Sequence, residues 1–164
     1  MAFHETTTVA HPAAEVCAAL LDEQFHRDFT SQMGGEVVAF EKQGTDTGPV
    51  TITMVRTVPG NRLPDMARKF VGDKLRVEQV ETWSAPAEDG SRTGQITLTV
   101  PTAKVSAEVH QTVEAQGEGT QLGVEGSVAC RIPLVGNKLA QAAEPMVSKV
   151  LGKQARGLSA WLNR

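Results

Sequence analysis

Four polar residues occupy positions in predicted strands whose neighbours on the same face are apolar. They are Arg56, Gln79, Glu81 and Gln111. Burial of a carboxylate is costly unless the group is paired, and without a partner its pKa rises. One interpretation makes them polar anchors in an otherwise apolar small-molecule pocket. The alternatives are a structural ion pair between Arg56 and Glu81, or a shift of strand parity that places one or both in water.

The other candidate ligand-binding residues would form the apolar lining of that pocket. Strand positions would provide the floor, and two positions on a C-terminal helix would provide the ceiling. Trp83 could form one wall of the pocket, with Gly94 and Gly126 leaving clearance for a ligand. Alternatively, Trp83 is an ordinary core residue and the two glycines accommodate the twist of the sheet. The set is Trp83, Ile96, Leu98, Val109, Met146 and Val150.

The histidines show no metal-binding pattern. No pair among His4, His11, His26 and His110 has helical i, i+4 spacing or alternate-strand spacing together with a carboxylate. We therefore predict neither a metal nor another cofactor. On a short helix, His26 and Asp28 are expected at the solvated surface rather than in a catalytic site.

The nucleophilic residues form no recognisable catalytic motif. Cys17 and Cys130 are expected to be small buried hydrophobic residues with reduced thiols. The sequence contains neither a Gly-x-Ser-x-Gly elbow nor a phosphate-binding loop. No catalytic residue is assigned on this basis.

Alternating apolar residues and turn signals predict seven strands. Between the first two strands, Pro12 opens a short Ala-rich helix, and Phe25 and Phe29 lie on a second helix that ends at Gly34. The later strands collect apolar side chains on one face and polar ones on the other, which is typical of an antiparallel sheet covered on one side. The strands cover residues 3–10, 36–43, 49–58, 74–84, 92–100, 104–115 and 120–132.

The stretch from Leu134 to Leu162 has helical apolar spacing over many turns and is expected to cover that apolar face. Pro145 lies inside it, and a proline there removes one backbone hydrogen bond and favours a bend. The predicted order is therefore one strand, two short helices, six strands and one long helix.

Composition restricts the class of protein. The chain has 164 residues, which suits a single domain over residues 1–164, and 16 Lys and Arg against 19 Asp and Glu. No basic stripe suggests nucleic acid as a partner, and no apolar run approaches the roughly 20 residues needed for stable membrane insertion. The first residues lack the pattern of a signal peptide, so a cytoplasmic location is expected. The oligomeric state is left open.

This order of elements resembles the START-like, or helix-grip, superfamily, which includes polyketide cyclases, plant pathogenesis-related allergens and lipid-transfer domains. The chain looks most like an uncharacterised, chiefly actinobacterial family within it, although Cys17 stands where an aromatic residue is common. The resemblance implies an α+β helix-grip fold, with a seven-stranded curved antiparallel sheet around a long C-terminal helix. The residues that carry it are Pro12, Glu15, Val16, Leu20, Asp22 and Phe25.

The resemblance implies a cavity that admits hydrophobic or amphipathic molecules, but no particular reaction. We therefore expect binding or carriage of a lipid, quinone or polyketide-like molecule, without catalysis or with weak catalysis. One alternative is a cyclase, dehydratase or hydrolase that uses Glu81, its pKa raised by burial, as general acid or base. Another is a co-chaperone-like protein-interaction domain, which would have a filled interior and an exposed apolar patch.

A movable lid over residues 63–72 is a further hypothesis. Leu63, Met66 and Phe70 share one side of a predicted helical turn, next to Arg68 and Lys69. Such a segment could touch a membrane during lipid exchange. The alternative is a packed connection whose basic residues stay in water.

Overall fold

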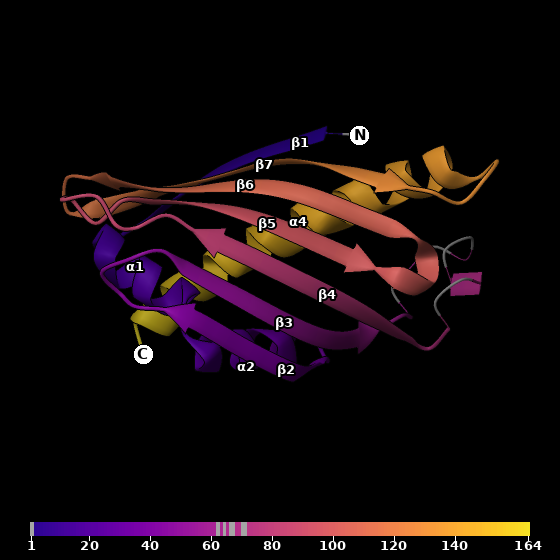
Figure 1. Ribbon diagram of the computed structural model, residues 1–164, viewed down its shortest axis with the longest axis horizontal. Coiled ribbons are helices and arrows are strands. Elements are labelled where there is room, and N and C mark those ends of the chain that lie inside the picture. Colours follow the sequence, from indigo (N-terminus) through magenta and orange to yellow (C-terminus); the bar gives the residue numbers. More distant parts are fainter. Residues whose placement is uncertain (1, 62, 64, 66–67, 70–71) are drawn as a thin grey trace.

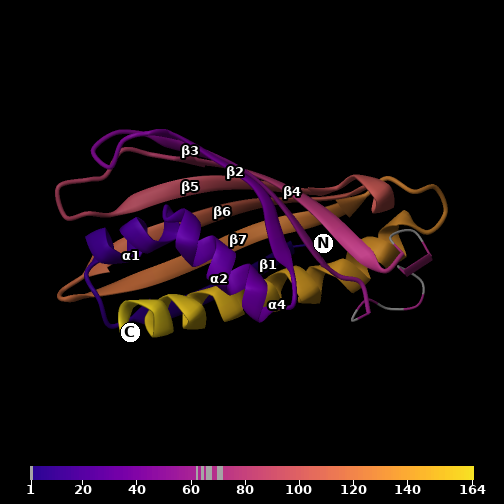
Figure 2. The ribbon, with the colours of Figure 1, turned by 90° about the horizontal axis from the view of Figure 1, so that it is seen from below.

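The computed structural model describes residues 2–61, 63, 65, 68–69 and 72–164. It consists of one curved sheet with helices on one of its faces (Figures 1 and 2). The strands are β1 (Ala2–Val9), β2 (Glu36–Gly44), β3 (Val50–Pro59), β4 (Lys74–Trp83), β5 (Arg92–Val100), β6 (Val105–Gln116) and β7 (Gly119–Cys130). The helices are α1 (Ala13–Leu20), α2 (Glu23–Gln32), the 3-10 turn η1 (Pro101–Ala103) and α4 (Gly136–Leu162).

The seven strands form a single sheet in the order β1-β7-β6-β5-β4-β3-β2, and each neighbouring pair is antiparallel. The strands from β2 to β7 follow one another as hairpins, and β1 pairs with β7, the last strand in sequence (Figure 1). This confirms the predicted fold and element order. Each strand boundary lies within two residues of the predicted one.

The strand registers confirm the predicted division into two faces. Glu81 lies opposite Ile96, and Ile96 lies opposite Val109, so the inward positions form continuous rows across the sheet. Gln111 lies opposite Val124 in the same way. A shift of one residue in any of these pairings would turn a whole set of side chains to the other face.

The long helix α4 lies across the inner face and packs mainly on β7 and β1 (Figure 2). It contains Pro145, as predicted, and its sheet-facing residues include Leu139, Ala155 and Leu158, all buried. The helix begins at Gly136 rather than at Leu134, which was expected within it. Leu134 is instead a fully exposed loop residue with φ of 72°, a left-handed conformation that a helix does not admit.

The two short helices occupy the link between β1 and β2 and close one end of the curved sheet (Figure 2). Pro12 precedes α1, and the Asp22 side chain caps α2 by accepting a hydrogen bond from the Gln24 N–H at 2.8 Å. Gly34, with φ of 81°, follows α2 and turns the chain toward β2. Phe25 on α2 packs against Trp161 of α4, so this end of the interior is filled by aromatic side chains.

The segment proposed as a lid falls partly outside the described residues. Met66 and Phe70 are not among them, whereas Leu63 is half-buried and Arg68 and Lys69 are exposed. In the part of the chain that the structure describes, no helix has both the length and the apolar character needed to cross a membrane.

Candidate functional site

A chain of buried polar side chains crosses the inner face of β3 and β4. Arg56 Nη2 donates a hydrogen bond to Gln79 Oε1 at 2.7 Å, and Gln79 Nε2 donates to Glu81 Oε2. All three side chains are buried. The β3–β4 register creates this arrangement, because it places Gln79 opposite Met54, one inward position from Arg56. A guanidinium and a carboxylate are thereby connected through one amide.

Trp83 continues this chain along β4. Its Nε1 donates to Glu81 Oε1 at 2.8 Å, so both carboxylate oxygens of Glu81 accept a hydrogen bond. The indole ring lies over Gly94, where a Cβ atom would come within 2.8 Å of the ring. Gly94 therefore makes room for Trp83, and the indole fills the space above this glycine.

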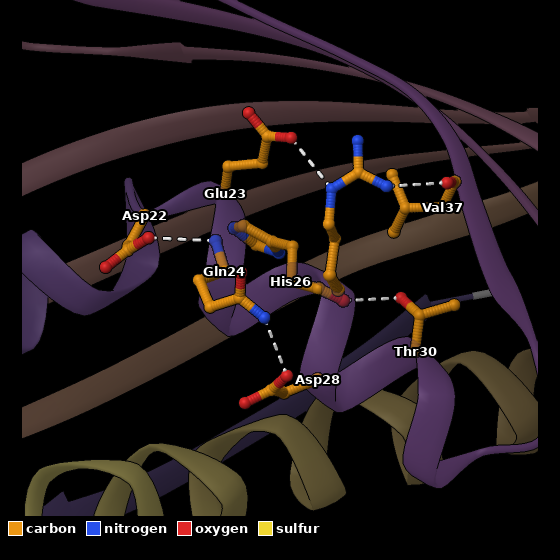
Figure 3. A network of polar contacts seen from close by, with 8 residues as sticks. Asp22, Glu23, Gln24, His26, Asp28, Thr30 and Val37 are labelled. Atoms are coloured by element: carbon orange, nitrogen blue, oxygen red, sulfur yellow. Dashed lines mark hydrogen bonds and ion pairs between the residues drawn. The ribbon is translucent and has the colours of Figure 1, made fainter.

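Two residues of helix α2 extend this series of hydrogen-bonded side chains beyond Arg56. Arg56 Nη1 donates to Thr30 Oγ1 at 3.4 Å. Thr30 Oγ1 in turn donates to the His26 carbonyl at 2.7 Å, as Figure 3 shows. The His26 ring lies 2.6 Å from the Leu20 carbonyl through Nε2, which must therefore carry the proton. His26 Nδ1 and Arg56 Nε are buried, and neither has a hydrogen-bond partner in the part of the chain that the structure describes.

The expected position of His26 at the solvated surface is wrong, because the side chain is only 1% exposed. The inward face of α2 holds Phe25 and Phe29, and the residue after each of them, His26 and Thr30, is also buried. Asp28 is on the other side, half-buried, and accepts a hydrogen bond from Gln24 (Figure 3). The i, i+4 spacing of His26 and Thr30 beside the phenylalanine pair is the sequence signal that could have identified them.

Burial and charge determine the protonation of this site. Burial lowers the pKa of His26, while the carboxylate of Glu81 acts in the opposite direction. The pKa of Arg56 is also lowered by burial, and Glu81 opposes this shift too. His26 is therefore neutral at pH 7, beside a buried guanidinium and a buried carboxylate.

The geometry bears on two alternatives for Arg56 and Glu81: a direct ion pair between them, or a shift of strand parity that turns one or both into water. Both side chains are buried, so neither is turned into water. Within the described parts of the chain, the ion pairs closer than 4.0 Å all lie on the surface, and Arg56 and Glu81 do not form one directly. Their link passes through Gln79 instead.

The fourth polar candidate, Gln111, lies apart from this chain, beside a small cavity under α4. The cavity measures about 20 Å³, which is room for about one water molecule. Gln111 Oε1 is buried and has no hydrogen-bond partner among the described residues. Of the six apolar candidates, Trp83, Ile96 and Val109 are buried, whereas Leu98, Met146 and Val150 are half-buried. The cavity beside Gln111 is therefore far too small to enclose a ligand, and half of the apolar candidates remain partly accessible to solvent.

Sequence reasoning also missed Arg92, which is 4% exposed. Its guanidinium donates to the backbone carbonyls of Gly48, Ser84 and Asp46 and so holds two neighbouring turns together. The inward parity that Arg92 shares with Gly94 and Ile96 was the available signal. Arg92 supports the loops and does not extend the polar chain.

The interpretation as a protein-interaction domain requires a filled interior and an exposed apolar patch. The small size of the cavity beside Gln111 is consistent with the first requirement, for the part of the interior that the structure describes. The large apolar residues that are exposed in the described structure lie on three different elements: Val38 on β2, Val80 on β4 and Leu134 before α4. Among the described residues, no three His, Cys, Asp or Glu side chains gather in a way that could hold a metal ion.

A curved seven-stranded antiparallel sheet that grips a long C-terminal helix is the START-like, or helix-grip, fold. The chain belongs to the family described as "Protein of unknown function (DUF2505)", whose model matches residues 4–162. A curated relative is "Uncharacterized protein Rv0481c" of Mycobacterium tuberculosis. It is 23% identical over 120 residues, which cover 71% of this chain and 68% of the relative.

Solved structures share the fold at low sequence identity. The Zhui aromatase/cyclase from Streptomyces sp. R1128 is 14% identical with a TM-score of 0.67, covering 100% of this chain and 94% of that one. A START superfamily protein from Mycobacterium smegmatis is 14% identical with a TM-score of 0.57, covering 98% of each chain. Norcoclaurine synthase from Thalictrum flavum, in complex with dopamine and hydroxybenzaldehyde, is 14% identical with a TM-score of 0.54, covering 99% and 86%.

Proposed function

We propose that this protein binds a hydrophobic small molecule, such as a lipid, a quinone or a polyketide-like compound, between the sheet and α4. The observation that carries the proposal is the buried chain of Arg56, Gln79 and Glu81 in an apolar interior. Buried charges contribute little stability compared with apolar packing of the same volume. Their presence in the buried interior therefore supports a role in recognition.

The unpaired atoms of the site are consistent with this role. Arg56 Nε can donate a hydrogen bond and His26 Nδ1 can accept one, and neither has a partner in the structure. A ligand with a carbonyl or hydroxyl group would satisfy such atoms, and an unsatisfied buried polar group costs about 1–3 kcal/mol.

In this proposal the polar residues orient the ligand and the apolar residues bury it. Arg56, Gln79, Glu81 and Gln111 hold the polar end, and the apolar contacts come from both sheet and helix. These contacts are Trp83, Ile96, Leu98, Val109, Met146 and Val150. Apolar burial of roughly 25 cal/mol per Å², less the cost of ordering, gives micromolar affinity.

The cavity beside Gln111 measures about 20 Å³, whereas typical ligand pockets measure about 300–1,000 Å³, so a ligand that enters there requires movement of α4. Little buried surface opposes that movement: no residue from Gln141 to Lys153 is fully buried. The fold neighbours support the proposal, since one is an aromatase/cyclase and another is a synthase in complex with dopamine and hydroxybenzaldehyde.

Native mass spectrometry of freshly purified protein, followed by extraction, tests the proposal. We expect a copurifying mass of lipid size, or saturable binding of the apolar dye 1-anilinonaphthalene-8-sulfonate. Glu81→Gln should weaken binding, whereas Glu108→Gln, the same change on the exposed face of β6, should not. Protein that carries no such mass and does not bind the dye saturably would contradict the proposal.

An acid–base enzyme is the second candidate, because His26, Arg56 and Glu81 interact electrostatically within one buried region. Glu81 would then act as general acid or base in a cyclase, dehydratase or hydrolase reaction. The two functions differ in their response to Glu81→Gln. An enzyme would lose its pH-dependent turnover, whereas a carrier would mainly change its affinity.

A further inference from the structure

A crevice between β1 and α4 connects the surface with the buried amide of Gln111. Gln111 is 4% exposed and Gln154 of α4 is 8% exposed, so both lie at the inner end of the cavity. Leu122, Leu158 and Val124 form its apolar walls. The residues at its mouth are Glu5 and Thr7 of β1 and Gly152 of α4.

The two glutamine amides are unpaired. Gln111 Oε1 is enclosed without a partner, and neither side chain makes a hydrogen bond to any residue that the structure describes. Each amide offers both donors and an acceptor. Because the buried Gln111 Oε1 is unsatisfied, a group that donates a hydrogen bond to it would be held at this point, in the same cavity as the Gln154 amide.

At the mouth of the crevice, β1 places two polar side chains and α4 places a glycine. The inward positions of β1 are apolar at Phe3 and Val9 but polar at Glu5 and Thr7. Opposite them on α4, a Cβ atom on Gly152 would meet only Arg156 Nη1, at 3.9 Å. Ser148 Oγ donates to Glu5 Oε1 at 2.7 Å and so connects the two walls beside the opening.

The charges lie at the mouth and not at the inner end. Glu5 and Arg156, of opposite sign, are both exposed, whereas the inner end holds only the neutral amides. A charged group at Gln111 would lose its hydration without gaining a counter-charge. A hydroxyl or carboxamide would lose less and would find both a donor and an acceptor.

We propose that this crevice binds the uncharged polar end, a hydroxyl or carboxamide, of a small amphipathic molecule, with Gln111 and Gln154 as its hydrogen-bonding anchors. The proposal rests on the proposed function, since both place a ligand between the sheet and α4. It shares only Gln111 with the polar residues named there and does not use Arg56, Gln79 or Glu81. A cavity of about 20 Å³ has room for one water-sized group. The apolar part of the molecule lies along Leu122 and the other apolar walls.

The test is a titration with n-butanol, butyrate and n-butylammonium, followed through the side-chain amide NMR signals of Gln111 and Gln154. Butanol should shift both signals saturably, and the charged analogues should bind at least about tenfold more weakly. Charged analogues that bind as well as butanol would overturn the proposal, as would the absence of saturable shifts with all three probes.

Variants separate the crevice from the rest of the interior. Gly152→Val fills the mouth and Gln111→Leu removes one anchor, and each should weaken butanol binding about tenfold. Ala160→Val, the matched change on the exposed side of α4, should leave it unchanged. Circular dichroism verifies that each variant is folded. Equal butanol affinity in all folded variants would overturn the proposal.

The proposed function can fail or hold independently of this site. A copurifying lipid-sized mass that persists in Gly152→Val, together with no butanol response, contradicts the crevice and leaves the proposed function intact. Saturable butanol binding without any copurifying mass or dye binding supports the crevice and contradicts the proposed function.

Discussion

His26 is the residue at which burial and charge act most directly on each other. Its ring packs against Phe25 and Phe40, its Nε2 donates to Leu20, and its Nδ1 is unpaired. Glu81 and Asp22 raise the pKa of His26 and Arg56 lowers it, but burial outweighs these effects and the pKa is below 6.5.

The lowered pKa of His26 predicts that acid destabilises the folded protein. Below pH 6.5 the unfolded chain binds a proton at His26 that the folded chain excludes. The contribution of neutral His26 to the free energy of unfolding is therefore fully present above that pH and is lost as the pH falls. The free energy of unfolding should decrease by up to about 1.4 kcal/mol per pH unit in this range. Urea unfolding between pH 7 and pH 5 measures it.

The matched variants for this prediction are His26→Gln and His4→Gln. The first should flatten the dependence on pH, because glutamine can still donate to the Leu20 carbonyl but does not titrate. The second changes an exposed histidine on β1 and should retain the slope. An unchanged slope in His26→Gln would assign the acid sensitivity to other groups.

At the scale of elements, the middle of α4 is less buried than the C-terminal end of the helix. The segment that follows Pro145 has no fully buried residue until Gln154, whereas the last turns bury Gln154, Ala155 and Leu158. Pro145 also removes the backbone hydrogen bond that would reach Gln141. The middle of the helix should therefore open more readily than its C-terminal end.

Hydrogen exchange checks this prediction for α4. Amides of residues 146–153 should exchange faster than those of residues 155–162, and a bound ligand should slow the first group more than the second. Pro145→Ala restores the missing donor and should slow exchange around it. Equal protection along the helix would show that α4 opens as one unit.

At the scale of the whole molecule, the first strand closes the sheet against the last one. Ala2 lies opposite Ser127, whereas every other neighbouring pair of strands is consecutive in sequence. Closing so long a loop has a large entropic cost before its contacts are gained. The pairing of β1 with β7 should therefore form after the hairpins.

Pulse-labelled hydrogen exchange during refolding tests this order. Amides of β3 to β6 should gain protection before those of β1, and Thr7→Ala, on β1, should accelerate unfolding rather than slow folding. The corresponding reference is Thr97→Ala in β5, within the hairpins, which should slow folding. Protection of β1 in the earliest phase would contradict the prediction.

The sequence determined the elements and their faces. The alternation of apolar and polar residues, together with the turn residues, predicted the boundaries of each strand to within two residues. Helical spacing predicted the long helix correctly except for its first two residues. These features are predictable because they depend on neighbours in sequence, whose side chains point to known sides of a strand or helix. The inward parity of Arg56, Gln79, Glu81 and Gln111 followed in the same way.

Only the tertiary structure decided which of these side chains meet. Strand register placed Gln79 between Arg56 and Glu81, and the docking of α2 brought His26 and Thr30 to them. The docking of α4 left Gln111 beside a cavity of about 20 Å³. Periodicity specifies a face but not a distance across it, because the separation of side chains from different elements depends on how the whole interior packs.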